Sequence, residues 1–234
     1  MASASVALGA AFLAFHNTTR SIRGAREQET HRRKRKQSAV RAVLPIALSE
    51  LSGYAEQSAN QLNNVSPTMG MTDRRIEPIP TKTLERLADF IEYSDTVDVA
   101  VVEATTAFVQ IFNSRLRALI DADTPTTPTT QWEIAARILD AASIYAGAAA
   151  VYAYARRQKE QLPHSVSWGD VRGALSNMGF LEGEHEDLDK MLEGRKKLSA
   201  GPFDHLARRS TCPAGLELEA VKSTGERSDR SEAT

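Results

Sequence analysis

The sequence contains a single cysteine, Cys212, so no disulfide can form within the chain. Cys212 lies in a polar C-terminal stretch, without a neighbouring histidine or helix start that would favour a reactive thiolate. A reducing compartment is the natural location for such a chain. With 41% hydrophobic and 25% charged residues, the composition is that of an ordinary globular protein, which excludes the fibrous and disulfide-built classes.

The sequence also lacks the common motifs of catalytic sites. Neither the phosphate-binding pattern G-x-x-x-x-G-K nor the nucleophile pattern G-x-S-x-G occurs. The histidines are scattered, and none stands beside a nucleophile signature: His16, His31, His164, His185 and His205. We therefore predict a protein that is not an enzyme, with no catalytic residue, no cofactor and no small-molecule substrate. An enzyme whose site is assembled from dispersed residues stays open as an alternative.

Metal binding is also weakly supported. Acidic residues surround His185, but their spacing matches neither a calcium-binding loop nor the H-E-x-x-H pattern of zinc proteases. These residues are Glu182, Glu184, Glu186, Asp187 and Asp189. We therefore predict no metal site.

The net charge of −1 conceals two regions of opposite charge. Residues 1–72 hold nine Lys or Arg and four Asp or Glu, a balance of +5. Residues 73–234 hold twenty Lys or Arg and twenty-six Asp or Glu, a balance of −6. Phosphate contacts need a basic surface, so the acidic body argues against a nucleic-acid partner.

An apolar segment without charged side chains, Ala2 to Phe15, opens the chain. We predict that residues 1–22 form a membrane anchor. A helix of this apolar length covers about 20 Å, which is short of the ~30 Å hydrocarbon core. Spanning therefore requires extension to Ile22, with the Arg20 side chain reaching the interface, unless the segment lies along the surface or Met1 is not the natural start. The predicted anchor residues are Val6, Leu8, Phe12, Leu13 and Phe15.

A basic stretch over residues 23–41 follows the apolar segment. No Lys or Arg precedes that segment, so the positive-inside rule places the N-terminus outside and the body in the cytoplasm. Five consecutive cations are the predicted contacts to anionic lipid headgroups or to a partner: Arg32, Arg33, Lys34, Arg35 and Lys36. The same five residues are also compatible with a solvated helix face or a nuclear localisation signal. The N-terminal region as a whole is also compatible with a mitochondrial transit peptide, or with a buried or frayed helix that has no targeting role.

The body is predicted to be all-α, with a helical bundle over residues 42–162. An apolar stripe runs from Ser38 to Leu62, and Pro45 within it predicts a kink or a helix break. After a loop over residues 63–80, we expect a helix that Thr81 caps and that buries Leu84, Leu87, Ala88 and Ile91. A long helix over residues 96–121 should follow, with a cap at Ser94 and Asp95.

Thr130 and Glu133 form the S/T-x-x-E pattern of a capping box and predict a helix from Gln131 to about Leu162. Its middle, residues 141–155, is uncharged and rich in alanine, and it is bounded by Asp140 and Arg156. Fifteen residues are fewer than the ~20 that a membrane span needs, so we predict a central core helix. Tyr145 and Tyr152, seven residues apart, should lie at the edge of this core.

Residues 163–205 predict a pair of short helices near Ser167 to Met178 and Gly183 to Leu198, separated by a stop at Gly179. The pair has the outline of a helix-turn-helix, but the acidic residues around the second helix would repel phosphates. Residues 206–234 are predicted to be a disordered tail.

Together these patterns predict a helical protein held at a membrane by its N-terminus, with an interaction or structural role. The first alternative is a soluble helical scaffold whose basic arm binds a protein partner.

Overall fold

The computed structural model describes the backbone of residues 2–64, 78–94, 99–122 and 130–204, and the side chains of these residues except 2–15, 17 and 120–122. Helices and short connections make up all of these ranges, which confirms the all-α prediction. The helices are α1 (Ala2–Asn63), α2 (Thr81–Tyr93), α3 (Ala100–Ala122), α4 (Gln131–Ala155), α5 (Trp168–Asn177) and α6 (Glu186–Leu198). The predicted tail, 206–234, and most of the predicted loop, 63–80, lie outside the described residues, as does Asp95.

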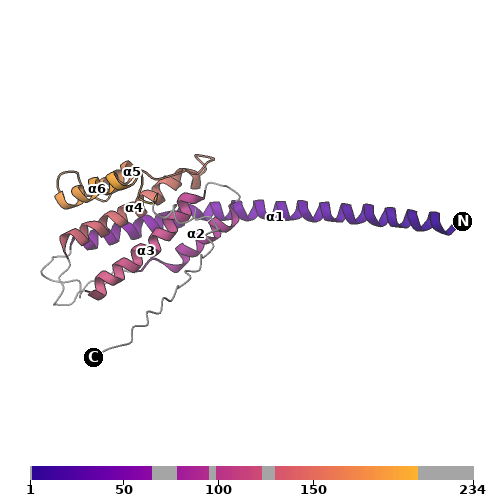
Figure 1. The fold of residues 1–234 in the computed structure, drawn as a ribbon, viewed down its shortest axis with the longest axis horizontal. Coiled ribbons are helices and arrows are strands. Elements are labelled where there is room, and N and C mark those ends of the chain that lie inside the picture. The colour runs from indigo at the N-terminus through magenta and orange to yellow at the C-terminus, as the bar shows by residue number, and fades with distance from the viewer. Residues whose placement is uncertain (1, 65–77, 95–98, 123–129, 205–234) are drawn as a thin grey trace, which may run out of the picture.

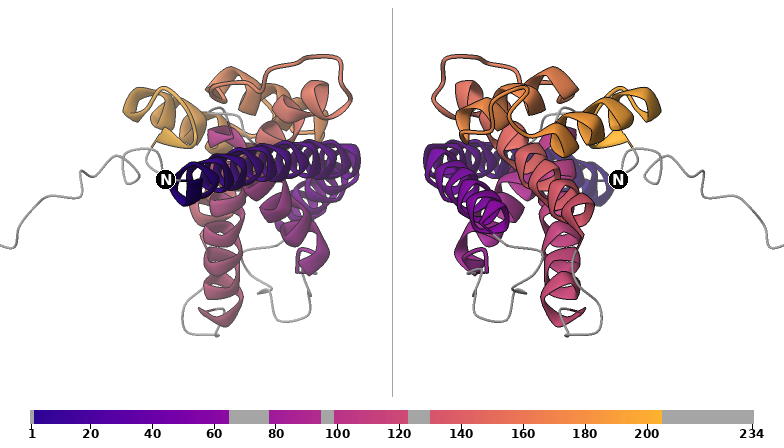
Figure 2. Two further views of the ribbon diagram at one scale, coloured as in Figure 1. Left: turned by 90° about the vertical axis from the view of Figure 1, so that its right-hand side faces the viewer. Right: turned by 90° about the vertical axis from the view of Figure 1, so that its left-hand side faces the viewer.

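Helix α4 is the centre of the bundle. It packs against α1, α3, α5 and α6. In the end-on views, α5 and α6 lie on one side of α1 and α4, and α2 and α3 lie on the other (Figure 2). Thr130 accepts a hydrogen bond from the Glu133 amide while the Glu133 carboxylate accepts one from the Thr130 amide, so the predicted capping box is confirmed.

Most of α4 is buried, as expected for a core helix. Among the described residues it is the one helix that is long and apolar enough to cross a membrane, and its burial in the bundle accounts for that composition. Tyr145 and Tyr152 are partly buried at the edge of the core, as predicted. The close approach of α3 and α4 is allowed by Gly147, because a Cβ atom there would collide with the Thr105 side chain.

Helix α4 ends at Ala155, seven residues earlier than predicted. Arg157 has φ of 60°, the left-handed conformation that ends many helices, although it is not a glycine. Arg41 of α1 donates hydrogen bonds to the carbonyl oxygens of Tyr154 and Lys159. The Tyr154 carbonyl also accepts from the Arg157 amide, and Lys159 lies in the turn after the helix, so Arg41 ties the end of α4 and the following turn to α1.

Helix α1 is continuous through Pro45. Of the kink or helix break expected there, the break does not occur. Proline removes one backbone hydrogen bond and disfavours a helix interior by about 3 kcal/mol. On both sides of Pro45, Leu44, Ala47 and Leu48 are fully buried against the bundle. Burial of a leucine side chain contributes about 1.5–3 kcal/mol, which offsets the effect of the proline.

The prediction for α2 was wrong in two respects. Pro80 occupies the cap position and Thr81 is the first helical residue, without a side-chain capping bond. The buried face consists of Thr83, Leu87 and Phe90, whereas Ala88 is exposed and Leu84 and Ile91 are half-buried. The helix is rotated relative to the prediction because Thr83 and Arg86 both bind the Glu50 carboxylate of α1.

Helices α5 and α6 form the predicted short pair on the outside of α4 (Figure 1). Ser167 and Asp170 form a capping box at the start of α5, and Gly179, with φ of 91°, follows its end. Helix α6 begins at Glu186, three residues later than predicted, because Gly183 has φ of 85°, outside the helical range. The Gly183 amide donates a hydrogen bond to the Asp189 carboxylate. Leu188, Met191 and Leu192 face the core as predicted.

Candidate functional site

The part of α1 that precedes the bundle projects away from it as a single helix (Figure 1). The predicted anchor residues lie on this projecting part, within the described helix, but their side chains are outside the described ones: Val6, Leu8, Phe12, Leu13 and Phe15. From His16 to Lys36, every described side chain is exposed or half-buried. No described side chain of the arm is therefore buried over this range.

The five predicted contact residues, Arg32 to Lys36, are exposed and lie where α1 joins the bundle. The Lys36 ammonium group lies 4.3 Å from the centroid of the Tyr93 ring and donates a hydrogen bond of 3.1 Å to its hydroxyl oxygen. Arg33 forms an ion pair of 3.5 Å with Glu29 on the arm. Arg32, Arg33 and Lys36 line a groove of about 380 Å³ together with Glu29, Glu92 and Tyr93. Lys34 and Arg35 are not among the lining residues.

The next turns of α1 are bound to the bundle. Ser38 accepts a hydrogen bond of 3.2 Å from Arg157. The Arg41 guanidinium lies 3.8 Å from the centroid of the Tyr154 ring in addition to its bonds to the end of α4. Arg41 belongs to the basic stretch in the sequence, but in the structure it is half-buried and joins two helices. It is therefore not available to a lipid or partner in the way that the exposed arm cations are.

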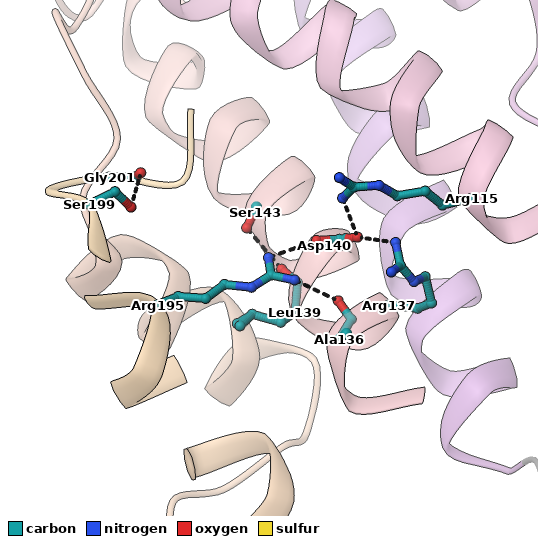
Figure 3. A network of polar contacts seen from close by, with 9 residues as sticks. All are labelled: Arg115, Ala136, Arg137, Leu139, Asp140, Ser143, Arg195, Ser199 and Gly201. Atoms are coloured by element: carbon teal, nitrogen blue, oxygen red, sulfur yellow. Dashed lines mark hydrogen bonds and ion pairs between the residues drawn. The ribbon is translucent and has the colours of Figure 1, made fainter. Parts of the chain in front are cut away.

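A second polar cluster, which the sequence analysis did not find, surrounds Asp140 in the middle of the bundle (Figure 3). The Asp140 side chain is fully buried. Its Oδ2 atom accepts hydrogen bonds from Arg115 of α3 at 3.1 Å and from Arg137 of α4 at 2.7 Å, and Oδ1 accepts one from Arg195 of α6 at 2.8 Å. We call Arg115, Arg137 and Arg195 the arginine cluster. One carboxylate thus connects three helices.

The arginine cluster is only partly shielded from water. The exposed fractions of the three side chains are 43% for Arg115, 26% for Arg195 and 19% for Arg137. Burial lowers the pKa of the Arg137 guanidinium, and the nearby charges of Arg115 and Arg195 act in the same direction, whereas Asp140 opposes this change. The described side chains around Asp140 therefore carry more positive than negative charge.

The sequence indicates Asp140 only as the charged residue that bounds the uncharged segment 141–155. In the structure it lies in the core with three partners. A buried acid must be paired, and Arg137, three residues earlier on the same helix, was the available signal. Arg115 and Arg195 are 25 and 55 residues from Asp140 in the sequence, so no local pattern indicates them.

The acidic residues and the histidine near the start of α6 make contacts within the fold. Among the described residues, no group of three or more His, Cys, Asp or Glu side chains is arranged to hold a metal ion. Asp189 binds Arg172 and the Gly183 amide, and the His185 ring lies against Phe180 with centroids 5.3 Å apart. Burial alone would raise the pKa of Asp189, but these hydrogen bonds lower it overall. Cys212 and His205 lie outside the described residues.

Comparison with known proteins finds no matching family model, no matching curated sequence and no matching solved structure.

Proposed function

We propose that this protein is a membrane-anchored helical protein, in which residues 1–22 enter a bilayer and the bundle serves as an interaction or structural module in the cytoplasm. The observation that carries the proposal is the projecting arm of α1, whose described side chains from His16 to Lys36 are all exposed or half-buried (Figure 1). Residues 2–35 extend over about 50 Å at 1.5 Å per residue. Most helices in proteins are stabilised by packing of one face, and a bilayer supplies apolar surroundings for the first 14 of these residues.

Because the helix is continuous, the distance of each cation from the apolar segment follows from its position in the sequence. If the segment spans upright with Ile22 at the edge of the hydrocarbon core, Arg23 and Arg26 lie at the depth of the headgroups, since that layer is about 5–7 Å thick. Arg20 lies about 3 Å inside the core edge, and its long side chain can extend to the headgroups. Arg32 then lies about 15 Å beyond the core edge, near the limit set by a Debye length of about 8 Å beyond the headgroups. Tilting the arm brings Arg32 to Lys36 closer to the surface.

The distribution of the five consecutive cations favours an arm that meets the membrane end first. Because an α-helix has 3.6 residues per turn, Arg32 to Lys36 occupy more than one full turn and face every side of the arm. A helix that lies flat on a membrane has its charges on one face and its apolar residues on the other. The all-round charge is better suited to a helix surrounded by anionic headgroups, with each cation near the surface contributing about 1 kcal/mol.

The test is cell fractionation of the full chain and of a protein lacking residues 2–22, followed by alkaline extraction. We expect the full chain in the membrane fraction after extraction and the shortened protein in the soluble fraction. The deletion leaves the contacts of Lys36, Ser38 and Arg41 with the bundle in place. Protease treatment of sealed vesicles should digest the body from the cytoplasmic side. A full chain that is soluble, with or without residues 2–22, would refute the proposal.

A soluble scaffold with a basic, partner-binding arm is the second candidate, because the groove at the base of the arm has the size of a binding site. This candidate predicts association with an acidic protein that weakens as salt is added and that needs no detergent. Substitution of Arg32, Arg33 and Lys36 by glutamine would abolish that association, whereas membrane fractionation would be unaffected.

A further inference from the structure

The arginine cluster contains more positive charge than Asp140 can balance. Among the described residues, three guanidinium groups surround one carboxylate, which leaves two of these positive charges without an ionic partner of their own there. Glu133 also attracts Arg137 electrostatically, but its carboxylate is already bound by Thr130 in the capping box. Even if Glu133 is counted in full, one positive charge remains. A buried aspartate needs fewer cations than this for its own pairing.

The geometry places two of the guanidinium groups side by side. Arg115 and Arg137 donate to the same oxygen atom, Oδ2 of Asp140, each through its Nη1 atom. Since both nitrogens lie within about 3 Å of that oxygen, they are no more than about 6 Å apart. Each guanidinium carries five N–H donors, and only Nη1 is used toward Asp140. Among the described residues, no other hydrogen bond from these two side chains is seen, which leaves donors for a second acceptor.

The cluster is open to solvent on the side of Arg115, whose side chain is 43% exposed, while Asp140 closes the inner side. An anion approaching from solvent therefore meets the exposed part of Arg115, and 19% of the Arg137 side chain is exposed as well. The planar fork of arginine matches the paired oxygen atoms of phosphoryl groups.

We propose that the arginine cluster is a binding site for a phosphate oxyanion. The oxyanion would enter from solvent and bind Arg115 and Arg137, and its negative charge would balance the excess positive charge around Asp140. This inference is independent of the membrane proposal, because the cluster joins α3, α4 and α6 and not the arm. Occupation of the site would also draw these helices together, so phosphate should stabilise the folded chain.

The test is isothermal titration calorimetry of the full chain with inorganic phosphate, against sodium chloride of matched ionic strength. We expect saturable binding of phosphate and none of chloride. Arg115→Gln should weaken binding by about tenfold or more, because a charge-assisted hydrogen bond and one charge are lost. Arg117→Gln is the matched control, since it removes an exposed cation from the same helix two residues away and should leave binding unchanged.

A second variant separates charge from geometry. Arg115→Lys keeps the charge but lacks the planar fork, so phosphate binding should also weaken, and circular dichroism shows whether each variant is folded. A rise in the melting temperature with phosphate should be present in the wild type and in Arg117→Gln, and reduced in both variants of Arg115. The proposal is overturned if the wild type shows no saturable binding, or if Arg115→Gln and Arg117→Gln bind phosphate equally well.

Discussion

Replacement of Asp140 by asparagine tests whether one buried carboxylate holds the bundle together. Asparagine has nearly the same shape, so the change creates no cavity. The negative charge is lost, and the amide nitrogen must occupy the place of one oxygen atom, where it faces an arginine donor instead of accepting from it. The three guanidinium groups then repel one another without a central anion.

The expected loss of stability follows from how deeply Asp140 and its arginine partners are buried. Removing one partner from a buried ion pair destabilises a protein by about 3–5 kcal/mol, because the other charge is left uncompensated. Asp140 is fully buried, but the arginines are 19–43% exposed and can turn toward water. We therefore expect the lower end, about 3 kcal/mol of unfolding free energy. In a chain of this size 1 kcal/mol corresponds to about 2–4 °C, so the melting temperature should fall by about 6–12 °C.

Thermal and urea denaturation, followed by circular dichroism, measure this loss. Asp187→Asn is the control, because Asp187 is an exposed acid in the first turn of α6, and its neutralisation should change stability by no more than about 0.5 kcal/mol. Arg195→Gln should be destabilising in the wild type and nearly neutral in the Asp140→Asn protein, since its main partner is then absent. If Asp140→Asn loses no more stability than Asp187→Asn, the carboxylate does not organise the bundle.

Three further changes address other contacts of the bundle. Gly147→Ala should destabilise by about 1–3 kcal/mol in thermal melts, because its methyl group collides with the Thr105 side chain, and Thr105→Ala in the same protein should restore most of the loss. Arg41→Gln should destabilise by about 1–3 kcal/mol in urea titrations through loss of the bonds to the end of α4, whereas the same change at the exposed Arg35 should have no effect. The Thr83 hydroxyl, and to a smaller extent Arg86, lower the pKa of the Glu50 carboxyl below its ordinary 4.5. The stability that the ionised carboxyl supplies is therefore present above pH 4.5 and is lost as the pH falls through the lowered value. Urea titrations over this pH range should show a shallower loss for Glu50→Gln than for the wild type, and parallel curves would contradict the assignment.

The elements with strong local signals were predictable. The capping box at Thr130 and the stop at Gly179 were both confirmed, because a cap and a glycine in the left-handed conformation act within a few residues of the boundary they set. The end of α4 was not predictable in this way. Arg157 adopts the left-handed conformation without being a glycine, and the turn after the helix is bound by Arg41 of another helix.

The polar contacts of the core show the same limit. Periodicity alone assigned Ala88 to the buried face of α2, but Glu50 binds Thr83 and Arg86 and thereby determines the rotation of the helix. Such a contact joins residues more than thirty positions apart. The Asp140 network was not predicted, because only one of its three partners, Arg137, is near in the sequence.

Helix α1 belongs to both the arm and the core, and this has a mechanical consequence. Its residues beyond Pro45 include fully buried side chains such as Leu51 and Leu62, so the bundle fixes the direction of the helix. Where the arm emerges, Lys36 is bound to the end of α2 and Arg41 to the end of α4. Because the helix is unbroken, a force on the N-terminal segment reaches these two contacts directly instead of being absorbed by a flexible linker. A partner or membrane that holds the arm would therefore also orient the bundle.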